Sequence, residues 1–227
     1  MTTARITFPA RTGAAAQGEL ALPEGTDKVP AIVLIQEWWG INDHIRSMMN
    51  RFVHQRFLVL APDLYHGVAT RDPAEASKLM TELDGYRSVE EIAGAVRYAA
   101  THERCNGKVG VIGFCMGGAF SFRAVANIPE VAAAVPFYGI PRADTCDFAK
   151  VRAPILAHFA SRDEWASADK ARAIKEQIEK AGHTSMELCV YEADHAFVND
   201  TRPEVYAPEA AKLALDRTYA FLHQHLD

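Results

Sequence analysis

The chain has 227 residues, of which 49% are hydrophobic and 23% are charged, and its formal net charge is −5. This composition excludes a disordered chain, and the length fits a single domain over residues 1–227. The acidic balance argues against nucleic acid or an anionic membrane as the main partner. We expect a small-molecule partner, bound by a monomer or a homodimer.

The four cysteines, at positions 105, 115, 146 and 189, are widely spaced and include no C-x-x-C pair. Neither a zinc site nor a dithiol redox motif is therefore expected, and no metal or cofactor is predicted. The N-terminal residues lack the apolar stretch of a signal peptide, and no segment is long and apolar enough to span a bilayer. The sequence predicts a reduced, cytoplasmic protein.

Short apolar runs predict the strands of a mostly parallel sheet. Residues 5–8 and 18–22 fit an antiparallel hairpin at one edge of this sheet. The run Ala31–Ile35 is continuously apolar, as a strand that is covered on both faces must be. Further strands are expected at residues 57–61, 109–113, 132–138, 155–159 and 186–191.

Amphipathic helices fill the intervals between these strands. The first carries apolar residues from Ile45 to Val53 with three-and-four spacing, and Asp43 is its expected N-cap. Asp72-Pro73 opens the second helix, and Ser88–Glu91 has the spacing of a capping box for the third. Further helices are expected at residues 116–127, 168–181 and 208–225.

This alternation of strands and helices predicts an α/β fold. Its central sheet should be mostly parallel and flanked by helices on both faces. In such sheets ligands bind at the carboxyl ends of the strands. The loops that follow the strands are therefore where a functional site is expected.

The segment Gly113-Phe114-Cys115-Met116-Gly117 lies between an expected strand and an expected helix. It matches the nucleophile-elbow pattern G-x-S-x-G with cysteine in place of serine. In such an elbow a sharp turn lifts the middle side chain above the sheet, and the helix N-terminus favours its thiolate. The alternatives are a small buried cysteine in a glycine-rich turn and, less favoured for want of a P-loop lysine, a phosphate-binding loop.

A thiol nucleophile needs a base, and the base needs a group that orients it. On this scaffold the order along the chain should be nucleophile, acid and histidine. Asp163 follows one expected strand and His195 follows the next, so both should lie at the carboxyl edge of the sheet. These two residues are the candidate acid and base for Cys115.

Other titratable residues compete less well for these roles. His183 lies before the last strand, at the wrong edge; His158 lies inside a strand and is a core candidate; His66 precedes Cys115 in the chain. The loop carboxylates that remain as alternatives to Asp163 are Glu164 and Asp169. Asp194 is interpreted as a turn former beside the base.

The segment Gln36-Glu37-Trp38-Trp39-Gly40 follows the first central strand. A carboxylate there would project into the same crevice, and a backbone N–H there can stabilise an oxyanion together with the N–H of Met116. Taken alone, a residue such as Glu37 is most often a solvated loop acid, and tryptophans such as Trp38 and Trp39 are most often packing residues.

Five segments occur in an order that resembles one known family. They are Ile35–Asn42, Ala61–Tyr65, Gly113–Gly118, Phe137–Gly139 and Asp194–Phe197. Together they resemble the dienelactone hydrolase family, a branch of the α/β-hydrolases with a cysteine nucleophile. The similarity covers nearly the whole chain, and it implies an α/β-hydrolase fold and the hydrolysis of esters or lactones without a cofactor.

The resemblance also implies individual roles. Glu37 would contact the resting thiol until substrate displaces it, and the backbone N–H groups of Trp38 and Met116 would hold the oxyanion. The implied catalytic triad consists of Cys115, His195 and Asp163.

The sequence departs from the best-known members of this family at the positions that bind the substrate carboxylate. Those members bind it with two arginines; here one position is Asn199, and the other falls near Pro73 with Arg71 as the nearest substitute. Together with Trp38-Trp39 and Met80, this predicts apolar acyl or aryl esters in addition to acidic dienelactones. The expected pocket residues are Trp39, Tyr138, Phe197 and Asn199.

Three functional hypotheses follow from the sequence. The first is a hydrolase of carboxylic esters or lactones that passes through a thiol-ester intermediate. The second is a non-hydrolytic role, either small-molecule binding or thiol redox sensing at Cys115. The third is a thioesterase or other acyl hydrolase that uses the same residues.

Overall fold

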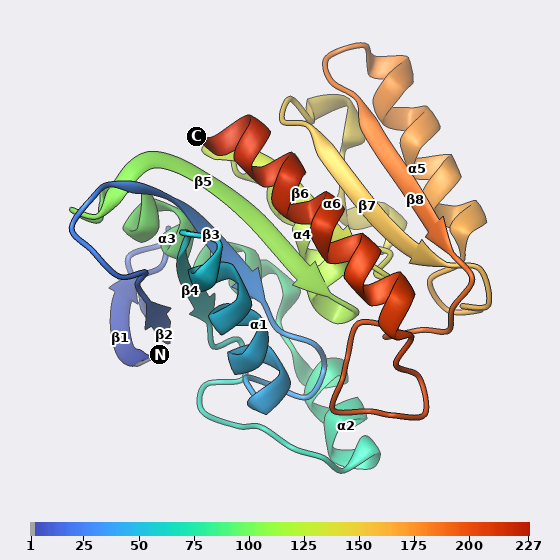
Figure 1. Ribbon diagram of the computed structural model, residues 1–227, viewed down its shortest axis with the longest axis horizontal. Coiled ribbons are helices and arrows are strands. Elements are labelled where there is room, and N and C mark those ends of the chain that lie inside the picture. The colour runs from blue at the N-terminus through green and yellow to red at the C-terminus, as the bar shows by residue number, and fades with distance from the viewer. Residues whose placement is uncertain (1–2) are drawn as a thin grey trace.

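The computed structural model describes residues 3–227. One sheet of eight strands runs through the molecule in the order β1-β2-β4-β3-β5-β6-β7-β8 (Figure 1). The strands from β4 to β8 along this order are parallel, whereas β2 pairs antiparallel with both β1 and β4. The strands are β1 Ala4–Pro9, β2 Ala15–Ala21, β3 Val29–Ile35, β4 Leu58–Pro62, β5 Cys105–Phe114, β6 Val131–Phe137, β7 Ile155–Ala160 and β8 Met186–Tyr191.

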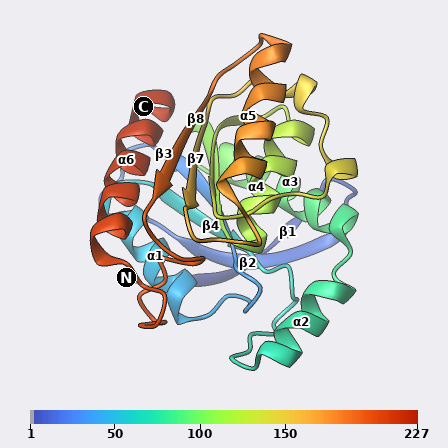
Figure 2. The ribbon, with the colours of Figure 1, turned by 90° about the vertical axis from the view of Figure 1, so that its right-hand side faces the viewer.

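Helices cover both faces of the sheet (Figure 2). The helices α3, α4 and α5 pack on one face and α1 and α6 on the other, while α2 lies to one side of the sheet. The predictions of an α/β fold, a mostly parallel sheet and an edge hairpin are confirmed. The helices are α1 Asp43–His54, α2 Pro73–Glu82, α3 Gly85–Thr101, α4 Met116–Asn127, α5 Ala168–Ala181 and α6 Pro208–Leu226.

The buried side chains form two cores, one on each face of the sheet. Along β3 every residue is buried, and successive side chains point to opposite faces. Ala31, Val33 and Ile35 therefore belong to the core beneath α3 and α4. Ile32 and Leu34 belong to the core beneath α1 and α6. Burial on both faces explains why this strand shows no alternation of polar and apolar residues.

Two expected helix starts are wrong. The N-cap of α1 is Asn42, whose Oδ1 accepts from the N–H of Ile45 at 3.1 Å, and Asp43 is the first helical residue. The third helix begins one turn before Ser88. Asp84 caps it by accepting from the N–H groups of residues 86 and 87, and the Ser88 hydroxyl donates to the Asp84 carbonyl inside the first turn. In both cases a short polar side chain that reaches two or three residues ahead set the boundary.

The parallel strands end at a common edge, and the loops that follow them meet there. These are the loops after β3, β5, β6, β7 and β8, which carry the candidate residues of the sequence analysis. Among residues 3–227, no helix combines the length and the apolar character that crossing a bilayer requires.

Candidate active site

Cys115 is the single residue between β5 and α4. Its backbone has φ +54° and ψ −114°, a conformation that is uncommon for a residue other than glycine. Holding such a residue in place costs about 1–3 kcal/mol, so the surrounding contacts must compensate. Its N–H donates to the Phe137 carbonyl at 3.1 Å, and its carbonyl accepts from the N–H of Ala119 at 3.2 Å. These bonds hold the sharp turn that the sequence predicts.

The glycines beside Cys115 are required by close approach of backbone to backbone. A Cβ atom on Gly113 would lie 2.1 Å from the carbonyl oxygen of Gly117, and one on Gly117 would lie 2.3 Å from that of Ile35. Both distances are far below van der Waals contact. The small residues that identified the turn in the sequence therefore allow the first turn of α4 to rest on β3 and β5.

His195 and Asp163 meet at the carboxyl edge of the sheet. The Nδ1 atom of His195 lies 2.5 Å from Oδ2 of Asp163. The other carboxylate oxygen of Asp163 accepts from the N–H groups of Trp165 at 3.0 Å and Ala166 at 2.9 Å. Asp163 is only 4% exposed, so these three contacts hold the carboxylate in one orientation.

The charges of Asp163 and His195 stabilise each other. Burial tends to raise the pKa of Asp163, but the hydrogen bonds from His195 and from the loop N–H groups lower it overall. Burial tends to lower the pKa of His195, but Asp163 and the Cys115 thiol outweigh it and raise that pKa to about 10. The pair therefore favours an imidazolium held by a carboxylate.

The second ring nitrogen of His195 is available for chemistry. Nε2 is buried and has no hydrogen-bond partner among residues 3–227, and His195 lines the same cavity as Cys115. The rings of Tyr138 and Trp165 lie edge-on to the imidazole, with centroids 5.2 and 5.6 Å away. These rings and the hydrogen bond with Asp163 limit rotation of the imidazole.

The competing histidines and carboxylates lie elsewhere. His158 is buried within β7, His66 pairs with Glu91 at 3.0 Å, and His183 is exposed before β8. Asp194 forms two hydrogen bonds with Arg162. The remaining alternatives to Asp163 are both exposed: Glu164 and Asp169.

Glu37 is 1% exposed and lies at the end of β3, as expected. Its Oε2 accepts from Nδ2 of Asn199 at 2.8 Å, whereas Oε1 is buried without a hydrogen-bond partner in the described chain. Within residues 3–227 no hydrogen bond joins Glu37 to Cys115. The hydrogen bond with Asn199 holds one oxygen of Glu37, and the contact of Glu37 with the resting thiol stays a prediction.

Two backbone N–H groups remain open beside the sulfur. In the described chain, neither the N–H of Trp38 nor that of Met116 donates a hydrogen bond. Met116 is the first residue of α4, where N–H groups lack helical acceptors and the helix dipole is positive. An oxygen that becomes negatively charged near Cys115 would find donors here.

A cavity of about 840 Å³ opens over Cys115 and His195. Trp38, Trp39 and Tyr138 line it, as expected, and its walls are mostly apolar. The sequence analysis missed several of its walls. Trp165 carried a signal, since it comes two residues after Asp163, whereas the others are brought in by the tertiary fold: Phe120, Arg123, Ile140, Pro141, Arg142 and Arg202.

Two of the four expected pocket residues lie outside this cavity. Phe197 is fully buried, because its ring packs between those of Tyr138 and Tyr191, with centroids 5.5 and 5.2 Å away. Asn199 faces a neighbouring cavity of about 430 Å³. The expectation that they line the pocket of Cys115 is therefore wrong.

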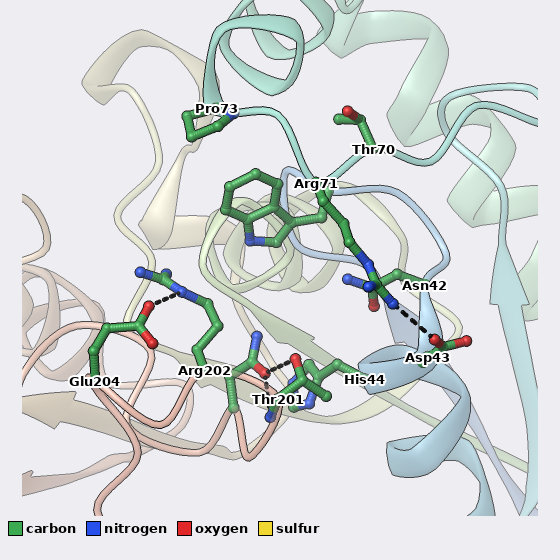
Figure 3. Close-up of a pocket in the computed structure, with 11 residues that line it drawn as sticks. Asn42, Asp43, His44, Thr70, Arg71, Pro73, Thr201, Arg202 and Glu204 are labelled. Carbon is green, nitrogen blue, oxygen red and sulfur yellow. Dashed lines mark hydrogen bonds and ion pairs between the residues drawn. The ribbon is translucent and has the colours of Figure 1, made fainter.

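The neighbouring cavity is separated from the first by Trp39, Pro73 and Arg202, which line both. Figure 3 shows Arg202 directed at Glu204, its partner at 2.8 Å, and Arg71 directed at Asp43 at 3.2 Å. Arg71, the nearest substitute for one family arginine, thus faces this second cavity and lies outside the one that contains the sulfur.

An eight-stranded, mostly parallel sheet with a sharp strand-to-helix turn after β5, a carboxylate after β7 and a histidine after β8 has the arrangement of an α/β-hydrolase. The model of the dienelactone hydrolase family matches residues 16–226. The chain belongs to the dienelactone hydrolase family.

Relatives and solved structures agree with this membership. Protein usf of Aquifex pyrophilus is 33% identical over 230 residues, covering 95% of this chain and 96% of its own. A carboxymethylenebutenolidase of Pseudomonas putida is 31% identical over 204 residues, 85% of each chain. A putative dienelactone hydrolase of Klebsiella pneumoniae superposes with a TM-score of 0.83 at 25% identity, covering 97% of this chain and 99% of its own. The predictions of the family, the fold and an ester-bond hydrolase are confirmed.

Proposed function

We propose that the protein hydrolyses carboxylic esters or lactones with Cys115 as nucleophile, His195 as acid and base, and Asp163 as the group that orients His195. The observation that carries this proposal is the His195–Asp163 pair, whose unpaired Nε2 belongs to a histidine that shares a cavity with a thiol on a strained strand-to-helix turn. A structural histidine or a buried cysteine needs neither feature.

The reaction begins when the thiol proton is held at Nε2 of His195 and the sulfur attacks the carbonyl carbon. The carbonyl oxygen takes the negative charge, and the N–H groups of Trp38 and Met116 stabilise it, each by about 3 kcal/mol. The C–O bond then breaks, the departing alkoxide takes the proton from Nε2, and a thiol ester remains on Cys115.

Water completes the cycle. Nε2, now without its proton, accepts one from water as the oxygen attacks the thiol ester. The C–S bond breaks, the acid product leaves, and the proton returns to the sulfur or stays on the imidazole. Asp163 stabilises the imidazolium in both halves.

The proposed substrates are broader than acidic dienelactones. The family position that carries an arginine for the substrate carboxylate is Asn199 here, whose amide is engaged with Glu37. Tryptophan rings and the Met80 side chain face the cavity instead. Three further predictions of the sequence stay predictions. They are a small-molecule ester or lactone as partner, a cytoplasmic location, and a monomer or a homodimer.

Cys115→Ala tests the proposal. Turnover of p-nitrophenyl esters should fall by roughly 10⁴-fold or more while the circular dichroism spectrum is unchanged. With substrate and rapid acid quench, mass spectrometry of the wild type should detect an acyl group on Cys115. Full activity in the variant would rule out the cysteine mechanism. Rapid alkylation of Cys115 by iodoacetamide without turnover of any ester would favour the redox-sensor hypothesis.

A further inference from the structure

One face of α4 forms a wall of the cavity that contains Cys115. Met116, Ala119, Phe120 and Arg123 all line it, and their spacing of three and four residues places them in one row along the helix. Because α4 begins directly after Cys115, the row starts at the nucleophile and leads away from it. The backbone of Arg123 lies eight residues beyond Cys115, a rise of about 12 Å along the helix axis, and its side chain reaches back over Phe120.

Three arginines line the cavity, and they differ in their partners. Arg202 pairs with Glu204 at 2.8 Å, and Arg142 pairs with Asp144 at 3.4 Å. Arg123 has no carboxylate within 4.0 Å among residues 3–227, and its Nε is buried without a hydrogen-bond partner. A half-buried cation that lacks a partner is unfavourable unless something else supplies one.

The charged groups around Arg123 do not satisfy it. Asp84 and Asp144 are close enough to act on its pKa, which burial lowers overall. Asp84, however, is engaged as the N-cap of α3, and neither carboxylate faces the cavity. Among residues 3–227, no carboxylate lines the end of the cavity around Arg123 and Arg142, and Arg123 is the cation there without an ion-pair partner.

The side chains between the two ends are apolar. The Phe120 ring lies under the Arg123 guanidinium, with Cζ 4.9 Å from the ring centroid, and Ile140 and Pro141 form the facing wall. A hydrocarbon chain fits this stretch better than a polar one, because burying a polar group without a partner is costly.

We infer that Arg123 binds an anionic group at the far end of the substrate, so that the preferred esters carry a carboxylate that an apolar chain separates from the scissile carbonyl. This inference rests on the proposed function and names its substrate class. It places the anion well beyond the reacting carbonyl, on the side of the cavity that α4 and the loop after β6 enclose.

The test compares two ester series that differ only at the far end. One is the p-nitrophenyl monoesters of straight-chain dicarboxylic acids of increasing length, and the other is the p-nitrophenyl esters of monocarboxylic acids of the same lengths. The terminal carboxylate should raise kcat/KM at least about tenfold at the length that spans the distance to Arg123, and much less at shorter lengths. Equal kcat/KM for the two series at every length would overturn the inference.

Variants assign the effect to a residue. Arg123→Gln should bring the ratio of kcat/KM between the two series to about one, and Arg123→Lys should keep part of it. Arg172→Gln is the matched control, because Arg172 is exposed on α5 and pairs with Asp169. A ratio that survives Arg123→Gln but is lost in Arg142→Gln would show that Arg142 holds the anion and that the inference is wrong.

A binding measurement separates this inference from the proposed function. Calorimetry of Cys115→Ala with the monomethyl esters of the same series of dicarboxylic acids needs no turnover, and the ester that binds most tightly is used for the comparison. Affinity should fall about tenfold when Arg123→Gln is added. If the wild type hydrolyses no ester, the proposed function fails, yet this loss of affinity would still support the anion site. Equal affinity in the two proteins, or none in either, would overturn it.

Discussion

Two histidines, one within β7 and one after the neighbouring strand β8, have opposite electrostatic environments. His158, within β7, is fully buried; its Nδ1 lies 2.9 Å from the Tyr191 hydroxyl and its Nε2 lies 3.0 Å from Oγ1 of Thr218. His195, after β8, pairs instead with the carboxylate of Asp163. Burial without a carboxylate lowers the pKa of His158 to about 3, whereas Asp163 helps raise that of His195 to about 10.

The comparison shows that the partner, more than burial, determines what a histidine can do. Hydroxyl groups accept from or donate to a neutral imidazole, and His158 thereby becomes part of the core, stacked on Phe137 at 4.4 Å. A carboxylate stabilises the imidazolium and leaves the other nitrogen free. That second arrangement is the one that moves protons.

Asp163→Asn should have the largest effect on activity, because it replaces the charged partner of His195 with a neutral one. We expect kcat for p-nitrophenyl acetate to fall by about 10⁴-fold, since the amide neither stabilises the imidazolium nor holds the required tautomer. The matched control is Asp194→Asn, which removes the neighbouring carboxylate that pairs with Arg162 at the surface. Similar rates for Asp163→Asn and the wild type would contradict the role of the pair.

His158→Ala should affect stability more than activity, which is the reverse of the effect expected for Asp163→Asn. Loss of a buried ring and its hydrogen bonds should lower the free energy of unfolding by about 3 kcal/mol, measured by urea denaturation, while kcat changes less than tenfold. His183→Ala replaces an exposed histidine and should stay within about 0.5 kcal/mol. A large loss of kcat with unchanged stability would place His158 in the reaction.

The contributions of His158 and His195 to stability should depend on pH in opposite ways. Both pKa values depart from the ordinary 6.5, but in opposite directions. His158 should stabilise the fold as a neutral ring, and this contribution is lost as the pH falls from 6.5 towards 3. His195 should stabilise it as an imidazolium, and this contribution is lost as the pH rises through about 10.

Nuclear magnetic resonance of ¹⁵N-labelled histidine follows both rings directly. The His158 signals should stay those of a neutral imidazole throughout the range in which the protein remains folded above about pH 3. The His195 signals should stay those of an imidazolium up to about pH 10, and Asp163→Asn should lower that midpoint. If both rings titrated near pH 6.5, the predicted difference between His158 and His195 would be refuted.

Asn199→Ala has the smallest expected effect. The Glu37 carboxylate would lose its buried donor, so stability should fall by about 1–3 kcal/mol. Asn199→Gln retains an amide and should recover part of this loss. If neither substitution changes the unfolding midpoint, the bond between Asn199 and Glu37 contributes nothing measurable.

Local patterns sufficed for much of the site. The small residues around Cys115 predict a tight turn because only they permit the backbone contacts that the elbow requires, and this signal lies within five consecutive residues. Asp163 and His195 were predicted from their positions after two strands, and the structure joins them at 2.5 Å. The catalytic roles of these three residues remain proposals that the variants test.

Other features were decided only by the folded geometry, either of a local turn or of contacts between distant segments. Asn42 and Asp84 capped their helices where other residues were expected, because side-chain reach in the folded turn decides between nearby candidates. Phe197 follows the base by two residues, yet it packs into the core behind Tyr138. No pattern near Asn199 indicated its bond to Glu37, which is 162 residues away in the chain.

The order of strands, helices and small residues along the chain by itself determined the class of fold and the place of the reactive turn, because hydrophobic periodicity and close backbone approach are local requirements. Only the tertiary structure decided which side chains enclose the cavity and which charges go unpaired within it. Arg123 illustrates the reason: its importance lies in the carboxylates that do not reach it, and their positions are set by α3 and by the loop after β6, far from it in sequence.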